Sequence, residues 1–246
     1  MNIKKLAIGA GIVVVVMIAA IWWLFFWGDT PEAVDVDAAN EQLDVDTAEE
    51  PTAATPEPFD GDINATWVVD DVIGEFDFET ASGSFAGFRV DEELTIGNVV
   101  AVGRTGGVSG TVTIDGDQLA AAEIIVDMAT ITSNDMRREF PIRLAVMAND
   151  FPTATFVLRE PVDLPLGLAD GETVQVTATG ELTVAGTTNE ATFTIDALVR
   201  ADGFGVITGS TTIGWEDYGV TPPNAPLVVS IDETGIVEFQ LIVTKG

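Results

Sequence analysis

A strict alternation of apolar and polar residues from Val174 to Val184 is the feature that most constrains how this chain can fold. Every even-numbered residue in the stretch is small or apolar, and every odd-numbered residue is polar. Such a repeat is typical of a β-strand with one face against apolar material and the other in water. The alternation resumes over residues 191–197 after a Gly-Thr-Thr turn at residues 186–188, so the two runs are expected to form a hairpin.

Similar short runs, separated by Gly, Asp and Asn, fill most of the chain after residue 63. They cover residues 66–70, 85–90, 108–114, 121–128, 154–158, 205–213 and 236–243. This spacing predicts a mostly β domain, either a closed barrel or a sandwich. A transmembrane barrel would carry girdles of aromatic residues, but the chain has a single Tyr. We therefore expect a soluble antiparallel β-barrel with an apolar interior.

One segment, residues 133–150, departs from the β pattern. Ser133 is a candidate helix N-cap. Large apolar residues then recur at intervals of three or four positions, at Met136, Phe140, Leu144 and Met147. Pro141 interrupts this helical pattern. The segment therefore predicts one short, kinked helix or two shorter ones.

The N-terminal residues form a separate region. Residues 6–27 contain no charged residue, and a helix of that length would extend roughly 33 Å, about the thickness of a bilayer core. Lys4 and Lys5 precede it and the next Lys or Arg is Arg89, so the positive-inside rule places residues 1–5 in the cytoplasm. The alternative is a cleaved signal peptide, but the apolar regions of signal peptides are shorter. We expect a transmembrane helix and a single-pass cell-membrane protein whose C-terminal domain is extracytoplasmic.

Residues 28–62 have a different composition again, with many Asp and Glu and no Lys or Arg. A segment with high charge and few large apolar residues cannot form a packed core, so we expect an acidic disordered linker. The remaining residues, 63–246, are numerous enough for one domain with a sizeable core.

Composition excludes several classes of function. The chain has no Cys and no His, which removes thiolate nucleophiles, disulfides and the commonest metal ligands and general bases. Carboxylates could support acid–base hydrolysis or binding of Ca²⁺, but no motif for either is present. The formal net charge of -30 argues against binding nucleic acid. We expect no enzymatic activity, no metal site and no cofactor.

Several motifs, in order, resemble those of a known family. They are Trp67 to Asp70; Ser84 with Phe88, Arg89 and Val90; Val108 with Gly110; Thr130 to Ser133 followed by Arg137; Phe151 to Phe156; and Gly180 to Thr187. In this order and spacing they resemble the YceI-like family of bacterial proteins. The resemblance implies a lipocalin-like antiparallel barrel that binds polyisoprenoids or other long-chain amphiphilic lipids. Family members often place Asp after the helix Arg and a His nearby, whereas here Arg138 and Glu139 follow Arg137 and no His exists.

The resemblance implies a lipid-binding cavity, and the clustering of four of the domain's eight basic residues at Arg137, Arg138, Arg143 and Arg159 indicates a headgroup site. The cavity candidates are the large apolar residues expected to point inward: Trp67, Phe88, Val112, Phe156, Leu182, Phe193 and Phe239. The alternative is that these residues only pack against each other. Arg137 and Arg138 are the candidates for binding the headgroup of an isoprenoid or quinone-like ligand. The alternative for the neighbouring Arg143 and Arg159 is ion pairing with Asp135, Glu139 or Glu160.

The function expected from the sequence is that of a membrane-anchored protein holding a long-chain lipid in its barrel. The alternative is a surface β-sandwich with a solid core, used for adhesion or for contacts with envelope proteins. The two differ in one physical property, the presence of a hollow apolar interior.

Overall fold

The computed structural model describes residues 30–49, 57–70, 75–95, 97–223 and 228–246. The compact unit that contains the barrel runs from Pro31 to Gly246, so it begins earlier than the predicted boundary at residue 63. The predicted membrane span at residues 6–27 lies outside the described residues. Within the described ranges, no helix combines the length and the apolar character that crossing a bilayer requires.

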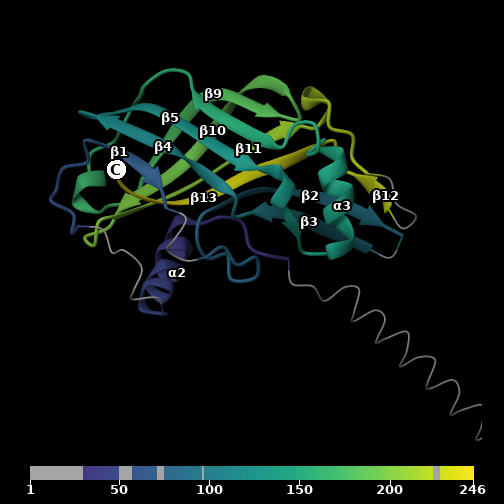
Figure 1. Ribbon diagram of the computed structural model, residues 1–246, viewed down its shortest axis with the longest axis horizontal. Helices are drawn as coiled ribbons and strands as arrows, with labels where there is room; N and C mark the ends of the chain where they lie inside the picture. Colours follow the sequence, from purple (N-terminus) through teal and green to yellow (C-terminus); the bar gives the residue numbers. More distant parts are fainter. Residues whose placement is uncertain (1–29, 50–56, 71–74, 96, 224–227) are drawn as a thin grey trace, which may run out of the picture. The chain divides into compact units, whose positions relative to one another are not determined.

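Eight antiparallel strands form a closed barrel (Figure 1). In spatial order they are β1 (Ala65–Val69), β4 (Val108–Asp115), β5 (Gln118–Asp127), β7 (Thr153–Leu158), β9 (Val174–Val184), β10 (Thr187–Val199), β11 (Phe204–Gly214) and β13 (Thr234–Lys245). The barrel closes because β13 pairs with β1, with Trp67 opposite Lys245. The predicted mostly β, antiparallel barrel is confirmed.

Strand β13 has two different partners along its length. Its C-terminal half pairs with β1, whereas its N-terminal half pairs with β2 (Phe85–Leu94). The sheet then continues through β3 (Gly97–Thr105) to the short β6 (Thr132–Ser133). Two further short strands, β8 (Val162–Asp163) and β12 (Val228–Ile231), pair with β5 and β2. Strands β2 and β3 thus extend the sheet beside the N-terminal half of β13, where β1 does not pair with it.

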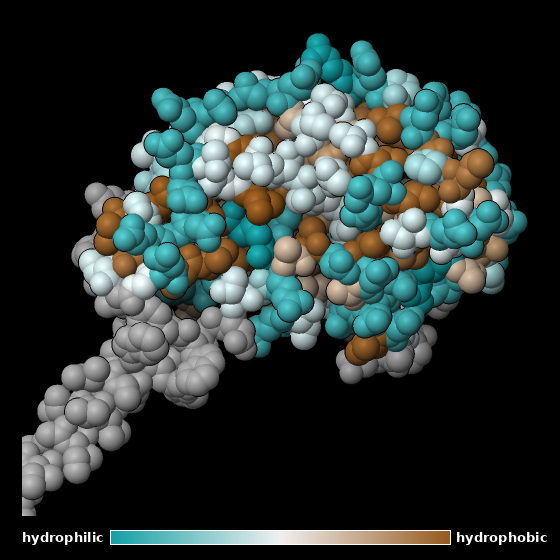
Figure 2. Space-filling model, turned by 180° about the vertical axis from the view of Figure 1, so that it is seen from behind, coloured by the Kyte–Doolittle hydropathy of each residue, from teal (hydrophilic) through white to brown (hydrophobic). Residues whose placement is uncertain are grey.

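The hairpin of β9 and β10 follows the predicted alternation. The even-numbered residues of β9 are buried or half-buried and face inward, with Ala178 fully buried, while threonines line the outer face. Across the hairpin, the hydroxyls of Thr179 and Thr192 lie 2.9 Å apart. The two turn residues are Ala185 and Gly186, and their φ angles are 51° and 76°. A two-residue hairpin turn of this kind needs positive φ at both positions. The outer surface mixes hydrophilic residues with smaller apolar groups on the face shown in Figure 2.

Helix α2 (Val36–Glu49) corrects the prediction of a disordered linker over residues 28–62 for the part of it that forms this helix. Asp35 caps the helix, since its Oδ1 accepts a hydrogen bond from the backbone N–H of Ala38 at 2.9 Å. Val36, Ala39 and Leu43 share one helical face and are buried against the outside of the barrel. Their barrel partners are Leu198, Phe204, Val206 and Ile242. Burial of this one apolar stripe stabilises the helix, although the rest of the segment is acidic.

Helix α3 (Met136–Ala145) occupies the segment in which a helix was predicted. It is one helix that contains Pro141, and the two-helix alternative is not observed. Its N-cap is Asp135, not the predicted Ser133. The Asp135 Oδ1 accepts a hydrogen bond from the backbone N–H of Arg137 at 2.9 Å. Among the described residues there are also three short 3₁₀ helices: Met128–Thr130, Leu168–Asp170 and Glu216–Tyr218.

Candidate functional site: an apolar cavity inside the barrel

The barrel encloses a cavity of about 180 Å³. A cavity needs roughly 10–15 Å³ to hold a single water molecule, so this one is far larger than a packing defect. Its lining comes from two clusters of buried apolar residues, one that contains Trp67, Leu168 and Val243 and one that contains Leu182, Phe193 and Ile213. A hollow interior was the property that separates a lipid-binding barrel from a β-sandwich with a solid core. The interior of this barrel is hollow.

All seven cavity candidates from the sequence line this space: Trp67, Phe88, Val112, Phe156, Leu182, Phe193 and Phe239. Three of them, Phe156, Phe193 and Phe239, also touch one another, as the alternative of mutual packing required. The rings of Phe156 and Phe193 meet edge to face at 5.1 Å, and Phe193 and Phe239 lie 5.6 Å apart. The structure thus brings the seven residues together around one cavity, and their contact with a lipid stays a prediction.

Glycines on neighbouring strands let the largest rings lie close to the barrel wall. Phe239 is paired across the sheet with Gly209, and Phe88 with Gly103. A Cβ atom at Gly209 would come within 2.4 Å of the Phe239 ring, and one at Gly103 within 2.6 Å of the Phe88 ring. A ring that covers a glycine packs against the backbone, and the space that it would otherwise fill in the lumen stays open.

The cavity presents almost no polar groups to a ligand. Apart from Thr105, Thr155 and Glu238, its lining consists of apolar residues and glycine. The two indole N–H groups at its wall are already bound to backbone carbonyls, that of Trp67 to Ile63 at 3.1 Å and that of Trp215 to Asp232 at 3.1 Å. The cavity can therefore hold an uncharged, apolar molecule and offers little to a charged one.

The carboxylate of Glu238 is held away from the cavity. Its neighbours Val237 and Phe239 line the cavity, so the alternation of the strand turns Glu238 to the outer face of the sheet. There it accepts hydrogen bonds from Arg104 at 2.7 Å and from Arg89 at 3.0 Å. Burial lowers the pKa of Arg104, and the charge of Glu238 opposes this effect.

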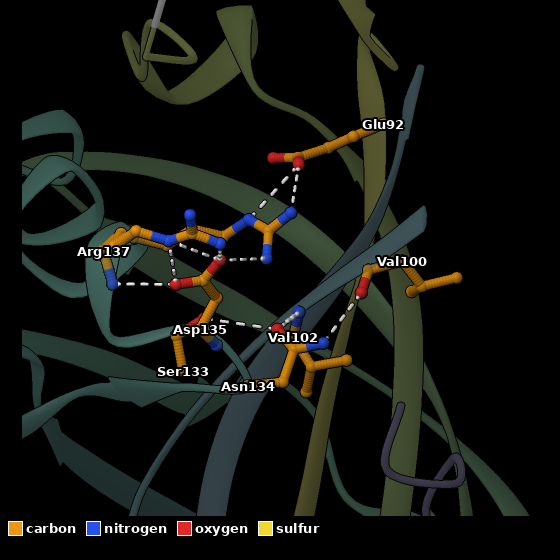
Figure 3. Close-up of polar contacts among 8 residues, drawn as sticks. Glu92, Val100, Val102, Ser133, Asn134, Asp135 and Arg137 are labelled. Atoms are coloured by element: carbon orange, nitrogen blue, oxygen red, sulfur yellow. Dashed lines mark hydrogen bonds and ion pairs between the residues drawn. The ribbon is translucent and has the colours of Figure 1, made fainter. Parts of the chain in front are cut away.

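Arg137 and Arg138, the headgroup candidates, both lie on α3 and both have carboxylate partners. Figure 3 shows Arg137 beside Asp135. Arg137 donates to Asp135 at 2.6 Å, while Arg138 donates to Glu92 on β2 at 2.8 Å. Its hydrogen bond to Asp135 raises the pKa of Arg137, and the same bond lowers the pKa of Asp135. The Arg137 side chain is 60 % exposed and that of Arg138 is 22 % exposed, so Arg137 is the more accessible to a ligand.

The other two arginines of this region form the kind of ion pair that we had proposed as the alternative. Arg143 lies 3.7 Å from Glu139, and its guanidinium also donates to the backbone carbonyl of Ile131 at 2.9 Å. Arg159 pairs with Glu190 on the neighbouring hairpin at 2.6 Å, although we had expected Glu160.

The sequence analysis missed several cavity-lining residues and one buried pair of charged residues. Val176 and Ile195 line the cavity and could have been found, because they share the inward face of their strands with Leu182 and Phe193. Ile131, Val146 and Trp215 also line it, but they lie in irregular segments where no periodic pattern predicts direction. The buried Arg104 and Glu238 gave no signal, since a charged residue at an outward strand position is normally solvent-exposed.

Comparison with known proteins places this fold. Several solved structures are similar to it, among them the following three. A polyisoprenoid binding domain from Saccharophagus degradans, implicated in plant cell wall breakdown, is 17% identical with a TM-score of 0.56, and the match covers 74% of this chain and 100% of that chain. BcnA from Burkholderia cenocepacia is 19% identical with a TM-score of 0.49, covering 65% and 96%. The Campylobacter jejuni YCEI protein is 15% identical with a TM-score of 0.45, covering 58% and 84%.

At these identities the first of these structures supports the fold alone. No curated protein matches the chain significantly. The model of the YceI-like domain matches residues 76–243, a range that contains α3 and all of the barrel strands except β1, although it stops within β13. Because this match spans more than half of the sequence, the chain belongs to the YceI-like domain family.

Proposed function

We propose that this protein binds a long-chain lipid, a polyisoprenoid or a similar amphiphile, with its hydrocarbon part inside the barrel. The observation that carries the proposal is the apolar cavity, whose widest side chains are packed over glycines so that the lumen stays open. Each Å² of hydrocarbon surface that enters it gains about 25 cal/mol. The similar domain from Saccharophagus degradans is a polyisoprenoid binding domain, which supports the same class of ligand.

The proposal has two finer parts. Residues 6–27 would anchor the chain in the cell membrane with the barrel on the extracytoplasmic side, as their uncharged run and the preceding lysines suggest. Arg137 would contact the polar end of the ligand, because its side chain is exposed and α3 is flanked by the cavity-lining Ile131 and Val146. Arg138 contributes less in this account, since it is engaged with Glu92.

Lipid extraction tests the proposal directly. The full chain is purified, extracted with organic solvent, and the extract is analysed by mass spectrometry. We expect an isoprenoid or other long-chain lipid in a constant molar ratio to protein. An extract with no stoichiometric lipid, from protein that is folded by circular dichroism, would show the proposal to be wrong.

A matched pair of variants locates the ligand. Ala122 lines the cavity, while its neighbour Ala121 on β5 is exposed on the opposite face. Ala122→Phe should fill part of the lumen and reduce the lipid content, whereas Ala121→Phe should leave it unchanged. Equal lipid content in both variants would place the lipid outside the barrel. The headgroup contact is tested by Arg137→Ala, which should lower lipid content relative to Arg159→Ala; Arg159 follows β7 and pairs with Glu190.

A further inference from the structure

The outer face of α3 carries three large apolar side chains in solvent. Met136, Phe140 and Leu144 are 82 %, 69 % and 62 % exposed. They are spaced four residues apart, so they form one stripe along the helix, while Ile142 on the other side is buried. Single exposed apolar residues are common, but a continuous stripe along a whole helix is typical of an interaction surface.

This stripe lies next to one end of the cavity. Ile131 and Val146, which precede and follow α3, both line the cavity. The Arg143 guanidinium ties the helix to the backbone carbonyl of Ile131 at 2.9 Å, and the N–H of Val146 donates to Ile142 at 3.0 Å. Figure 1 shows α3 beside β2 and β3. A molecule bound to the stripe would therefore be close to the lining of the cavity.

The charge of α3 differs from that of the rest of the chain. The helix contains three arginines and one glutamate, in a protein with 40 acidic and 10 basic residues. Arg137 and Arg143 flank the apolar stripe, and their side chains are 60 % and 33 % exposed with Asp135 and Glu139 as their carboxylate partners. Arg138 lies on the side of the helix that faces Glu92 on β2. An apolar face bordered by arginines is the pattern of a helix that lies in the interface of an anionic bilayer, with the arginine heads at the level of the phosphates.

We propose that α3 docks on the surface of an anionic lipid bilayer, with Met136, Phe140 and Leu144 inserted below the headgroups. The proposal rests on the proposed function, because a ligand drawn from a membrane would reach the cavity at its α3 end without crossing water. The expected depth is roughly 5–10 Å, as for other interfacial helices. The acidic remainder of the barrel is repelled by the same surface, which leaves α3 as the side that faces the bilayer.

The absence of Cys makes a site-specific test straightforward. Phe140→Cys and, as a matched control, Leu166→Cys are made in the full chain and labelled with an environment-sensitive fluorophore. Leu166 is also apolar and is 96 % exposed. Its neighbours Leu164 and Leu168 belong to the core cluster that contains Trp67. Each protein is reconstituted into vesicles of phosphatidylcholine and phosphatidylglycerol that contain lipids with a spin-label quencher on the acyl chain.

We expect the label at residue 140 to shift to the blue and to lose most of its fluorescence to a quencher near the headgroup, and less to one near the chain end. The label at residue 166 should do neither. Vesicles of phosphatidylcholine alone should quench residue 140 less. Equal behaviour of the two labels would overturn the proposal. So would a blue shift at residue 140 that depends on protein concentration without vesicles, because a second copy of the chain would then cover the stripe.

Lipid content is measured in the same preparations by mass spectrometry. Protein that carries stoichiometric lipid but shows no quenching at residue 140 overturns the docking alone. Protein that is quenched at residue 140 but carries no lipid leaves the docking in place and overturns the proposed function.

Discussion

Arg104 and Glu238 form an ion pair that is almost completely buried on the outer face of the barrel. The Nη2–Oε1 distance is 2.7 Å, and the two side chains are 0 % and 1 % exposed. Arg104 also lies over the ring of Phe85, 4.5 Å from its centroid, and donates to the backbone carbonyl of Glu32 at 2.6 Å. Arg89 binds the other Glu238 oxygen and the carbonyl of Pro31. The pair is thus part of a network that fastens the segment before α2 to strands β2, β3 and β13.

Glu238→Gln should lower the free energy of unfolding by about 3–5 kcal/mol, because it leaves the Arg104 charge buried without its counter-charge. Glu190→Gln is the control, since it breaks the Arg159–Glu190 pair, in which both side chains are more than half exposed. That change should cost less than about 1 kcal/mol. Urea denaturation measures both values, and a similar cost for the two variants would contradict this account.

The packing of α2 gives a second prediction. Leu43 is 1 % exposed against Phe204 and Ile242, so Leu43→Ala should lower the free energy of unfolding by about 2–5 kcal/mol. Val45 lies on the same helix but is 48 % exposed, and Val45→Ala should change stability by less than about 0.5 kcal/mol. Were residues 36–49 a free linker in solution, neither substitution would affect the denaturation midpoint of the barrel.

Gly209 controls the position of the Phe239 ring. In Gly209→Ala the new methyl group would meet the ring at 2.4 Å, and the ring, being the end of a flexible side chain, should rotate into the lumen. We expect lower lipid content per protein with only a small change in thermal stability. Ser210→Ala, the adjacent position on β11, is the control and should retain full lipid content. Lipid content in Gly209→Ala equal to that of the wild type would show that the ring does not limit the cavity.

Asp135 makes the stability of α3 depend on pH. Its hydrogen bond from Arg137 holds the pKa of Asp135 below the ordinary value of 3.8. A carboxylate with a lowered pKa stabilises the folded state fully above its ordinary pKa, and this contribution disappears as the pH falls through the folded-state value. Amide hydrogen exchange in α3, corrected for its intrinsic rate, should therefore stay constant from neutral pH to about pH 4 and accelerate below it.

Two variants separate the roles of Asp135. Asp135→Ala removes the N-cap and should weaken α3 by about 0.5–2 kcal/mol at neutral pH. Asp135→Asn keeps a capping oxygen but cannot titrate, so the acceleration at low pH that comes from this residue should disappear. Acceleration in Asp135→Asn identical to that of the wild type would assign the effect to another acid.

Much of the barrel could be predicted from short-range pattern. Val174–Val184 forms a strand with the predicted inward face, because the side-chain period of a strand is a property of the backbone. β3 was missed because Gly97 and Gly103 interrupt its apolar run, and its stability comes from pairing with β2. α2 was missed because its three buried apolar residues, Val36, Ala39 and Leu43, lie among many acidic residues and give no clear helical pattern. The helix depends on the barrel surface for the burial of these residues.

The sequence alone determined the fold class, the inward direction of the seven cavity residues and the family, because each of these follows from neighbours along the chain. The tertiary structure decided that the interior is hollow, that residues 36–49 pack as a helix and that Glu238 is buried with Arg104. These properties depend on residues far apart in the sequence, such as Gly209 with Phe239 and Arg104 with Glu238. No local pattern encodes such contacts, because they exist only after the strands have paired in register.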